Sequence, residues 1–454
     1  MPYIPHTEDD IKSMLDTIGV DAIDNLFDEI PADLNNEELA HIPQGINEMQ
    51  LNQLVESHAA NIKNHSNFIG AGSYEHHIPA AVWDITSRGE FLTAYTPYQA
   101  EASQGTLQLL YEYQTMMAEL TGTDVSNASL YDGASAMAEA VLMAIRANRK
   151  SKTKRILMAG TIHPYYHDTV DAIVRNQNIE LITLDIDYSK GTTALESLDK
   201  YQDEDITALV ISQPNFFGHL EDVDAMTDWA HAKNCFVIGC VNPISLGLLK
   251  APGQWGETGA DIVCGEGQPL GAPMASGGPY FGFLTAKMAY VRQMPGRIIG
   301  RTVDAEGKEG FSLTLQAREQ HIRRAKATSN ICTNQGLLVT AATIHMSLIG
   351  AQGLQNIAST CHHNTRVLLD SLIAIDGVSA EFSSPFFHEA VIKTPLPAST
   401  VLEKMREQGI SAGIDLSIYH PQMTHSILFC VTEVKQDSEI EAYANALRTV
   451  LIEN

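Results

Sequence analysis

The chain has 454 residues, 44% hydrophobic and 19% charged, a composition typical of a globular protein large enough for two domains. Its formal net charge of −26 argues against nucleic acid or an anionic membrane as a partner. The six cysteines form no CxxC pair, which indicates reduced thiols. The N-terminus lacks the apolar segment of a signal peptide, and no apolar run reaches the roughly 20 residues that span a bilayer. We therefore expect a soluble, cytoplasmic protein.

Residues 1–64 are predicted to form an N-terminal helical arm. Thr7 is placed to cap a first helix, with Asp9 and Asp10 in its first turn, and Gly19 is expected to end it. Shorter helices are expected at 21–29 and 47–64. An arm of this kind ahead of an α/β domain often packs on a partner subunit.

The segment 68–104 is rich in Gly, Tyr, His and Pro and shows little periodicity, so it is predicted to be an irregular loop. A loop of this length inside a compact domain is uncommon unless it is functional. Three of its tyrosines, at 74, 95 and 98, therefore favour a functional or interface role. A helix is expected directly afterwards, at 107–120.

From about residue 125, short continuous apolar runs alternate with helical patterns, which predicts an α/β domain with a mostly parallel sheet. The expected strands are 155–159, 179–184, 208–212, 236–239, 262–264 and 280–284. We assign 65–330 to this large domain, with 310–334 as a connector that carries a basic cluster. Residues 331–454 mix helices, at 336–348 and 354–373 among others, with strands, and are predicted to form a small C-terminal α+β domain.

The stretch 265–282 has the glycine content of a ligand-binding loop but few reactive side chains, since its one acid is Glu266 and it has no lysine or histidine. The chain contains no GxGxxG after a strand, no Walker A loop, no HExxH and no GxSxG. The histidine pairs 76–77, 362–363 and 420/425 have no acid or cysteine at ligand spacing, so no metal site is predicted.

Five ordered motifs carry a family resemblance that covers nearly the whole chain: FIGAGSYEHHIPAAV, TAYTPYQAEASQG, LTGTDVSNASLYDGASAMAEA, GQPLGAPMASGGPYFGF and REQHIRRAKATSNICTNQ. In these motifs the chain resembles the P-protein of the glycine cleavage system, and specifically the alpha subunit of its split, two-gene form. The resemblance implies the fold of type I pyridoxal-phosphate enzymes (aspartate aminotransferase-like), whose large domain contains a mostly parallel seven-stranded sheet.

Three positions depart from the family's catalytic pattern. Aligned on the shared Pro and GGP residues, Gln268 stands where the catalytic half has its Schiff-base lysine, and Gly239 stands where it has the aspartate that pairs with the pyridine nitrogen. Asp132 precedes the helix whose N-terminus would hold the cofactor phosphate. The resemblance therefore implies that this chain binds no cofactor and has no catalytic residue in its own pocket. A misalignment, with Lys250 or Lys287 as the Schiff-base lysine, stays open.

The resemblance further implies a homologous beta subunit that carries pyridoxal 5′-phosphate, an α2β2 assembly, and the lipoylated H-protein as a second partner. In that complex glycine loses CO2 and its aminomethyl group passes to the lipoyl arm. The residues expected to face the partner's site or the substrate are Tyr74, His76, Tyr95, Tyr98, Gln99 and Glu101. The alternatives are a structural or regulatory pseudoenzyme subunit and a self-sufficient pyridoxal-phosphate enzyme that uses another lysine.

Overall fold

The computed structural model describes residues 5–31, 33–34, 42–60 and 65–453. The chain divides into two compact units, Met1–Lys63 and Asn64–Asn454. In the first unit, helix α1 (Glu8–Ile18) begins where the Thr7 hydroxyl accepts from the Asp10 N–H at 3.3 Å, and it ends at a left-handed Gly19, as the sequence predicts. A 3₁₀ helix, Ile23–Phe27, replaces the second expected helix.

Helix α2 (Glu48–Ala59) begins after a capping Asn47, close to the predicted start of the third arm helix. The predicted end at 61–64 lies outside the described residues. Neither α1 nor α2 buries a residue in the described part of this unit. The second unit carries the hydrophobic core and all of the features discussed below.

A seven-stranded sheet of order β2-β10-β9-β8-β7-β3-β4 organises the second unit. Its central strands run parallel, while β10 pairs antiparallel with both β9 and β2. The bounds are β2 Val125–Ser126, β3 Arg155–Met158, β4 Glu180–Thr183, β7 Ala208–Gln213, β8 Phe236–Val241, β9 Ile262–Glu266 and β10 Gly282–Ala286. Six of these strands coincide with predicted ones, and the two-residue β2 is too short to be seen in the apolar pattern. The α/β fold class is confirmed.

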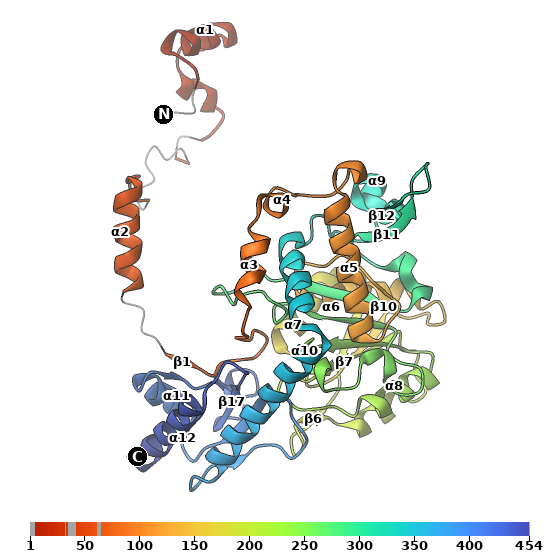
Figure 1. The fold of residues 1–454 in the computed structure, drawn as a ribbon, viewed down its shortest axis with the longest axis vertical. Coiled ribbons are helices and arrows are strands. Elements are labelled where there is room, and N and C mark those ends of the chain that lie inside the picture. Colours follow the sequence, from red (N-terminus) through yellow and green to blue (C-terminus); the bar gives the residue numbers. More distant parts are fainter. Residues whose placement is uncertain (1–4, 32, 35–41, 61–64, 454) are drawn as a thin grey trace. The chain divides into compact units, whose positions relative to one another are not determined.

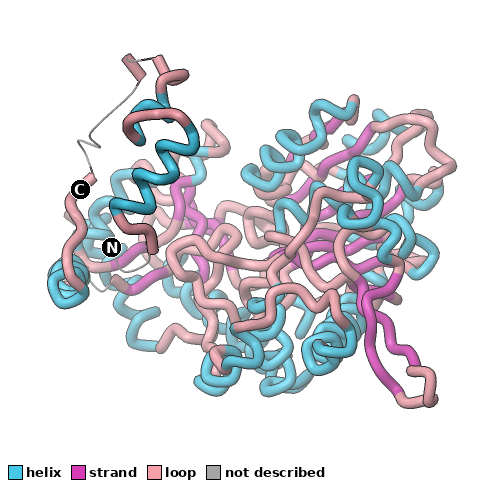
Figure 2. Tube along the Cα trace, turned by 90° about the horizontal axis from the view of Figure 1, so that it is seen from above, coloured by secondary structure: helices cyan, strands magenta, loops and turns pink. Residues whose placement is uncertain are grey.

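Helices lie outside the strands of this sheet (Figure 2), and their apolar faces fill the main core with the strands. They are α5 Gln104–Thr121, α6 Gly133–Ala147, α7 Pro164–Val174 and α8 Val223–Ala232. Because both faces of the sheet are covered, its central strands β7 and β8 are almost entirely buried and do not alternate, whereas the edge strand β4 exposes both of its ends.

Two predicted irregular segments contain regular structure. The segment 68–104 includes α3 (Ala80–Thr86), α4 (Gly89–Leu92) and a 3₁₀ turn at Ala100–Ala102, so it is less irregular than expected. Strand β12 (Glu309–Thr314) covers the start of the predicted connector and pairs with β11 (Ile298–Val303) in a hairpin (Figure 1). The helices and the turn have too few residues to show periodicity, and the hairpin strands are largely exposed and lack the continuous apolar run of a buried strand.

Helix α10 (Gly336–Ile373) joins the sheet region to the C-terminal region (Figure 1). It is interrupted at Gly350, where φ is +60° and ψ −177°, which matches the two helices expected from the sequence. By length and composition it is apolar enough to cross a membrane, but its two halves contribute buried side chains to the two main clusters of this unit, as a core helix of a soluble protein does.

The C-terminal region contains a four-stranded antiparallel sheet of order β13-β14-β17-β16 covered by two helices. The bounds are β13 Ser379–Ala380, β14 Glu389–Lys393, α11 Ala398–Glu407, β16 Ile414–Asp415, β17 Ser426–Cys430 and α12 Asp437–Ile452. The remaining short elements are β1 Ser66–Asn67, β5 Ile186–Asp187, β6 Thr192–Thr193, α9 Gln320–Arg323 and β15 Ile410–Ser411. This region and residues 65–330 belong to one compact unit, so the domain boundary at 330 stays a prediction.

We expect Leu209→Ala to lower the free energy of unfolding by about 2–5 kcal/mol, because Leu209 lies on the central strand β7 with 0% exposure and its removal leaves a cavity. Leu348→Ala, at a side chain 51% exposed, serves as the control and is expected to change it by less than about 0.5 kcal/mol. Urea unfolding followed by circular dichroism measures both. Equal effects of the two substitutions would contradict the assignment of β7 to the core.

Candidate functional site

A cavity opens at the carboxyl ends of β7, β8 and β9, the edge at which α/β sheets hold ligands. We call it the central cavity. Its lining includes His163 and Tyr166 at the start of α7, Cys240 and Asn242 at the end of β8, and Glu266 at the end of β9. Tyr74, Pro269 and Glu389 complete its other side. Related folds commonly hold a cofactor at this position. Which ligand the cavity can hold depends on the groups at the N-terminus of α6, beside Glu266.

Carboxyl groups occupy the N-terminus of α6. Asp132 caps the helix, and its Oδ1 accepts from the Ser135 N–H at 2.7 Å. Glu266 reaches the same end, where its Oε2 accepts from the Gly133 N–H at 2.9 Å. Gly133 is required here, because a Cβ would lie 2.3 Å from the Tyr166 hydroxyl and 2.7 Å from the Glu266 nitrogen. The N–H groups that bind a phosphate in related folds are therefore already used.

Burial decides the protonation of Glu266. It raises the pKa of this carboxyl to about 8, with a smaller contribution from the charge of Asp132, although backbone N–H groups of Gly133, Gln268 and Phe281 act in the opposite direction. Glu266 is therefore mostly protonated at neutral pH. The bulk of this side chain and the carboxylate of Asp132 do not fit the phosphate of pyridoxal phosphate.

Gln268, which the family resemblance aligns with the lysine, is a buried amide. Gln268 is 1% exposed, and its Nε2 donates to the carbonyls of Tyr74 and Ala272, each at 2.9 Å. Its Oε1 accepts from the Tyr74 N–H at 2.9 Å. Gln268 lines a neighbouring cavity next to His76, whereas Pro269 lines the central one. In the described part of the chain no lysine lines the central cavity.

Gly239 faces away from the central cavity. A Cβ at this glycine would meet the Trp255 ring at 2.9 Å, while the next residue, Cys240, lines the cavity. A carboxylate is absent from both positions. The two lysines considered as alternatives form ion pairs elsewhere, Lys250 with Asp224 and Lys287 with Asp261, each at 2.8 Å.

A second acid with a raised pKa, Glu389, faces the cavity from β14. Burial raises the pKa of Glu389 to about 7, although hydrogen bonds from Ala71 and Tyr74 lower it. Its Oε1 accepts from the Ala71 N–H at 2.6 Å, and its Oε2 accepts from the Tyr74 hydroxyl at 2.8 Å. Glu389 thereby holds the start of the 68–104 segment against the C-terminal sheet.

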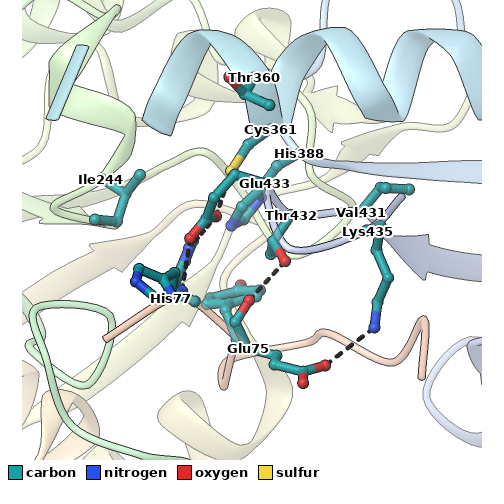
Figure 3. A network of polar contacts seen from close by, with 12 residues as sticks. Glu75, His77, Ile244, Thr360, Cys361, His388, Val431, Thr432, Glu433 and Lys435 are labelled. Atoms are coloured by element: carbon teal, nitrogen blue, oxygen red, sulfur yellow. Dashed lines mark hydrogen bonds and ion pairs between the residues drawn. The ribbon is translucent and has the colours of Figure 1, made fainter. Parts of the chain in front are cut away.

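His76, from the same segment, joins a partly buried network with Cys361 and Glu433, two residues labelled in Figure 3. Its Nδ1 is 2.7 Å from Oε2 of Glu433, and the Cys361 thiol donates to the same oxygen at 3.2 Å. The Glu433 Oε1 accepts from the His77 N–H at 2.8 Å. Burial opposes ionisation of Glu433, but the hydrogen bond and charge of His76 outweigh it and lower the pKa to about 2.

The other predicted residues lie on the surface. The Tyr95 side chain is 82% exposed, and Gln99 and Glu101 are exposed as well. The Tyr98 hydroxyl accepts from Arg297 at 3.0 Å, and its ring packs against His321. The structure therefore separates the six predicted residues into two groups, with Tyr74 and His76 facing inward and the other four outward.

Sequence reasoning assigned no role to Glu266, Glu389, Cys361 and Glu433. Glu266 was visible as the one acid of the glycine-rich loop. Glu389, Cys361 and Glu433 lie more than 280 residues after their partners in residues 68–77. Cys361, for example, follows His76 by 285 residues. Local spacing carries no signal for contacts of this kind.

We expect the unfolding free energy to fall as pH rises from about 4.5 to 8, because Glu266 has a raised pKa in the folded state and keeps a proton that the unfolded chain releases. Glu266→Gln removes this titration, so the fall should become shallower by up to about 1.4 kcal/mol per pH unit. Urea unfolding at a series of pH values measures the slope. Glu403→Gln, on an exposed position of α11, is the control and should keep the wild-type slope. An unchanged slope in Glu266→Gln would show that Glu266 is ionised in the folded chain.

Comparisons with known proteins agree with this architecture. The family model "Glycine cleavage system P-protein" matches residues 1–447. The chain is 64% identical over 451 residues to a protein of Legionella pneumophila (strain Philadelphia 1) named "Probable glycine dehydrogenase (decarboxylating) subunit 1", with 99% of each chain covered. A protein of the same name from Nitrosomonas europaea is 58% identical, again with 99% of each covered.

The chain is also similar to proteins of known structure. A crystal structure of glycine decarboxylase (P-protein) of the glycine cleavage system, in inhibitor-bound form, is 39% identical with a TM-score of 0.87, covering 99% of this chain and 100% of that one. A Burkholderia pseudomallei sphingosine-1-phosphate lyase, 14% identical with a TM-score of 0.68 over 93% of this chain and 94% of that one, shares the fold alone. The large sheet, the small C-terminal sheet and these matches together place the chain in the P-protein family of the glycine cleavage system.

Proposed function

We propose that this chain is the cofactor-free alpha subunit of a cytoplasmic two-chain glycine decarboxylase, active in complex with a homologous beta subunit that holds pyridoxal 5′-phosphate. Two observations support the role of one subunit among several: relatives that match the full length are named subunit 1, and the family is that of the P-protein. In the complex glycine is decarboxylated and its aminomethyl group is transferred to the lipoyl arm of the H-protein.

The occupied N-terminus of α6 carries the proposal. Asp132 and Glu266 use the Ser135 and Gly133 N–H groups that a phosphate would need. Gln268 has no amine that can form an imine, and Cys240 and Asn242 put no carboxylate into the central cavity from β8. Loss of the phosphate cradle, the lysine and the aspartate at separate positions favours a chain that leaves the chemistry to its partner.

The outward group of loop residues supports a subunit contact. Tyr95, with 82% exposure, and Tyr98, with 49%, are large aromatic side chains on one short segment, and Leu92 beside them is 55% exposed. Exposed aromatics of this kind are typical anchors of protein interfaces. We therefore propose Tyr95, Tyr98, Gln99 and Glu101 as residues that contact the beta subunit in an α2β2 assembly.

Tyr74 and His76 have a different role in this proposal. Both are held inside the chain, by Glu389 and Glu433 respectively. They fix the base of the 68–104 segment, and the segment's outward part then has a defined position for the partner's site. Positioning of this kind does not require that either side chain touches glycine.

We expect the purified full-length chain to retain no pyridoxal phosphate after gel filtration and to show no borohydride-reducible absorbance in the visible range. The homologous beta subunit, treated in the same way, is the control and should show one equivalent. A stoichiometric reducible band in this chain alone would favour the self-sufficient enzyme and overturn the proposal.

We expect Tyr95→Ala to weaken association with the beta subunit by roughly 30-fold, the effect of losing an interface anchor worth about 2 kcal/mol. Analytical ultracentrifugation of mixed subunits measures the change. Tyr165→Ala, at a tyrosine 59% exposed on α7, is the matched control and should leave association unchanged. Equal association and equal decarboxylation by wild type and Tyr95→Ala would remove support for an interface at this segment.

A further inference from the structure

The hydrogen-bonded group of His76, Cys361 and Glu433 has a second property besides holding the 68–104 segment. His76 Nδ1, Cys361 Sγ and one carboxylate oxygen of Glu433 all lie within 4.8 Å of one another. Donors bound to one zinc ion at about 2.0–2.3 Å are roughly 3.5 Å apart, so a small displacement suffices to receive a cation between them. The three residues come from the 68–79 segment, the second half of α10 and the residues after β17 (Figure 3).

We propose that His76, Cys361 and Glu433 form a binding site for a divalent transition-metal ion, with Zn²⁺ as the favoured occupant. Imidazole nitrogen, thiolate sulfur and carboxylate oxygen are the zinc donor set, whereas Mg²⁺ and Ca²⁺ prefer oxygen alone. Three protein ligands leave a fourth position for water.

The charge of the site suits a divalent ion. A thiolate at Cys361 and a carboxylate at Glu433 together balance two positive charges, so the occupied site is neutral at a position where a net charge would be costly. Binding replaces the two hydrogen bonds to Glu433 Oε2, and it releases the thiol proton and any second imidazole proton to solvent. The nearest basic side chain along the chain, Lys435, is paired with Glu75 at 3.1 Å.

Buried imidazole nitrogens around the cluster are a second and independent observation. His345 and His388 are each 1% exposed. Within the described residues, neither ring nitrogen of His345, nor Nδ1 of His388, nor Nε2 of His76 has a hydrogen-bond partner. The His388 ring stacks near that of His76, with centroids 6.3 Å apart. Unpaired buried nitrogens are uncommon in folded proteins, so the polar surroundings of the cluster have donors and acceptors still to be satisfied.

The proposed metal would join three parts of the compact unit that are distant in sequence. It would fix the base of the 68–104 segment to α10 and to the C-terminal sheet. A structural ion there would stabilise the folded chain in proportion to its binding free energy.

Metal analysis and cobalt substitution of the full-length chain test the proposal. After chelation, wild-type protein titrated with Co²⁺ should take up one ion per chain and show the near-ultraviolet absorption of a cobalt–thiolate bond, and Zn²⁺ should displace it. Cys361→Ser should lose the thiolate absorption, and Glu433→Gln should lose the stoichiometric uptake. Circular dichroism monitors the fold of both variants.

Cys332→Ser is the matched control, because Cys332 is exposed and is not one of the three clustered residues, and it should keep both the absorption and the uptake. Absence of a cobalt–thiolate band in folded wild type would overturn the proposal and leave a hydrogen-bonded His–Glu–Cys triad. Persistence of the band in Cys361→Ser, or its loss in Cys332→Ser, would overturn the ligand assignment as well.

Discussion

The burial of Glu266 at the N-terminus of α6 is the constraint on which the central cavity depends. The carboxyl lies where β9 ends, and it accepts from the N–H groups of Gly133 and Gln268. A helix N-terminus favours an anion, yet burial outweighs this preference and raises the pKa to about 8. The protein thus fills its most anion-attracting position with its own side chain in a neutral form. The cavity remains, while Asp132 and Glu266 accept from two N–H groups at the helix N-terminus beside it.

The 68–104 segment follows from the same arrangement. Its first residues line the cavity and are held by two acids, the buried Glu389 at Tyr74 and the partly buried Glu433 at His76. Its later residues turn outward and expose Tyr95 and Tyr98. One segment therefore connects the interior of this subunit with the surface on which we expect a partner. Rigid anchoring at one end is what allows an exposed loop to present side chains precisely at the other.

Sequence reasoning was most successful where many residues share one pattern. The parallel strands, the capped α1 and the break in α10 are each supported by several consecutive side chains, and all three are present. It missed β2 and the β11–β12 hairpin, which are too short or too exposed to produce a periodic signal. For the site, a surrounding motif led to the prediction that Gln268 stands at the lysine position, and that alignment stays a prediction. The hydrogen-bond partners of Tyr74 and His76 could not be predicted, since Glu389 and Glu433 are brought close to them only by tertiary folding.

The break at Gly350 has a consequence for how α10 tolerates change. In a continuous helix, inserting one residue rotates everything downstream by about 100°, so the faces of both halves must stay in phase. Here the backbone leaves the helical conformation at Gly350, and no atom lies within 4 Å of the position a Cβ would take. The two halves therefore need not share one continuous helical phase. The first contributes buried side chains to the main core, whereas the second contributes to both the main core and the core of the C-terminal region.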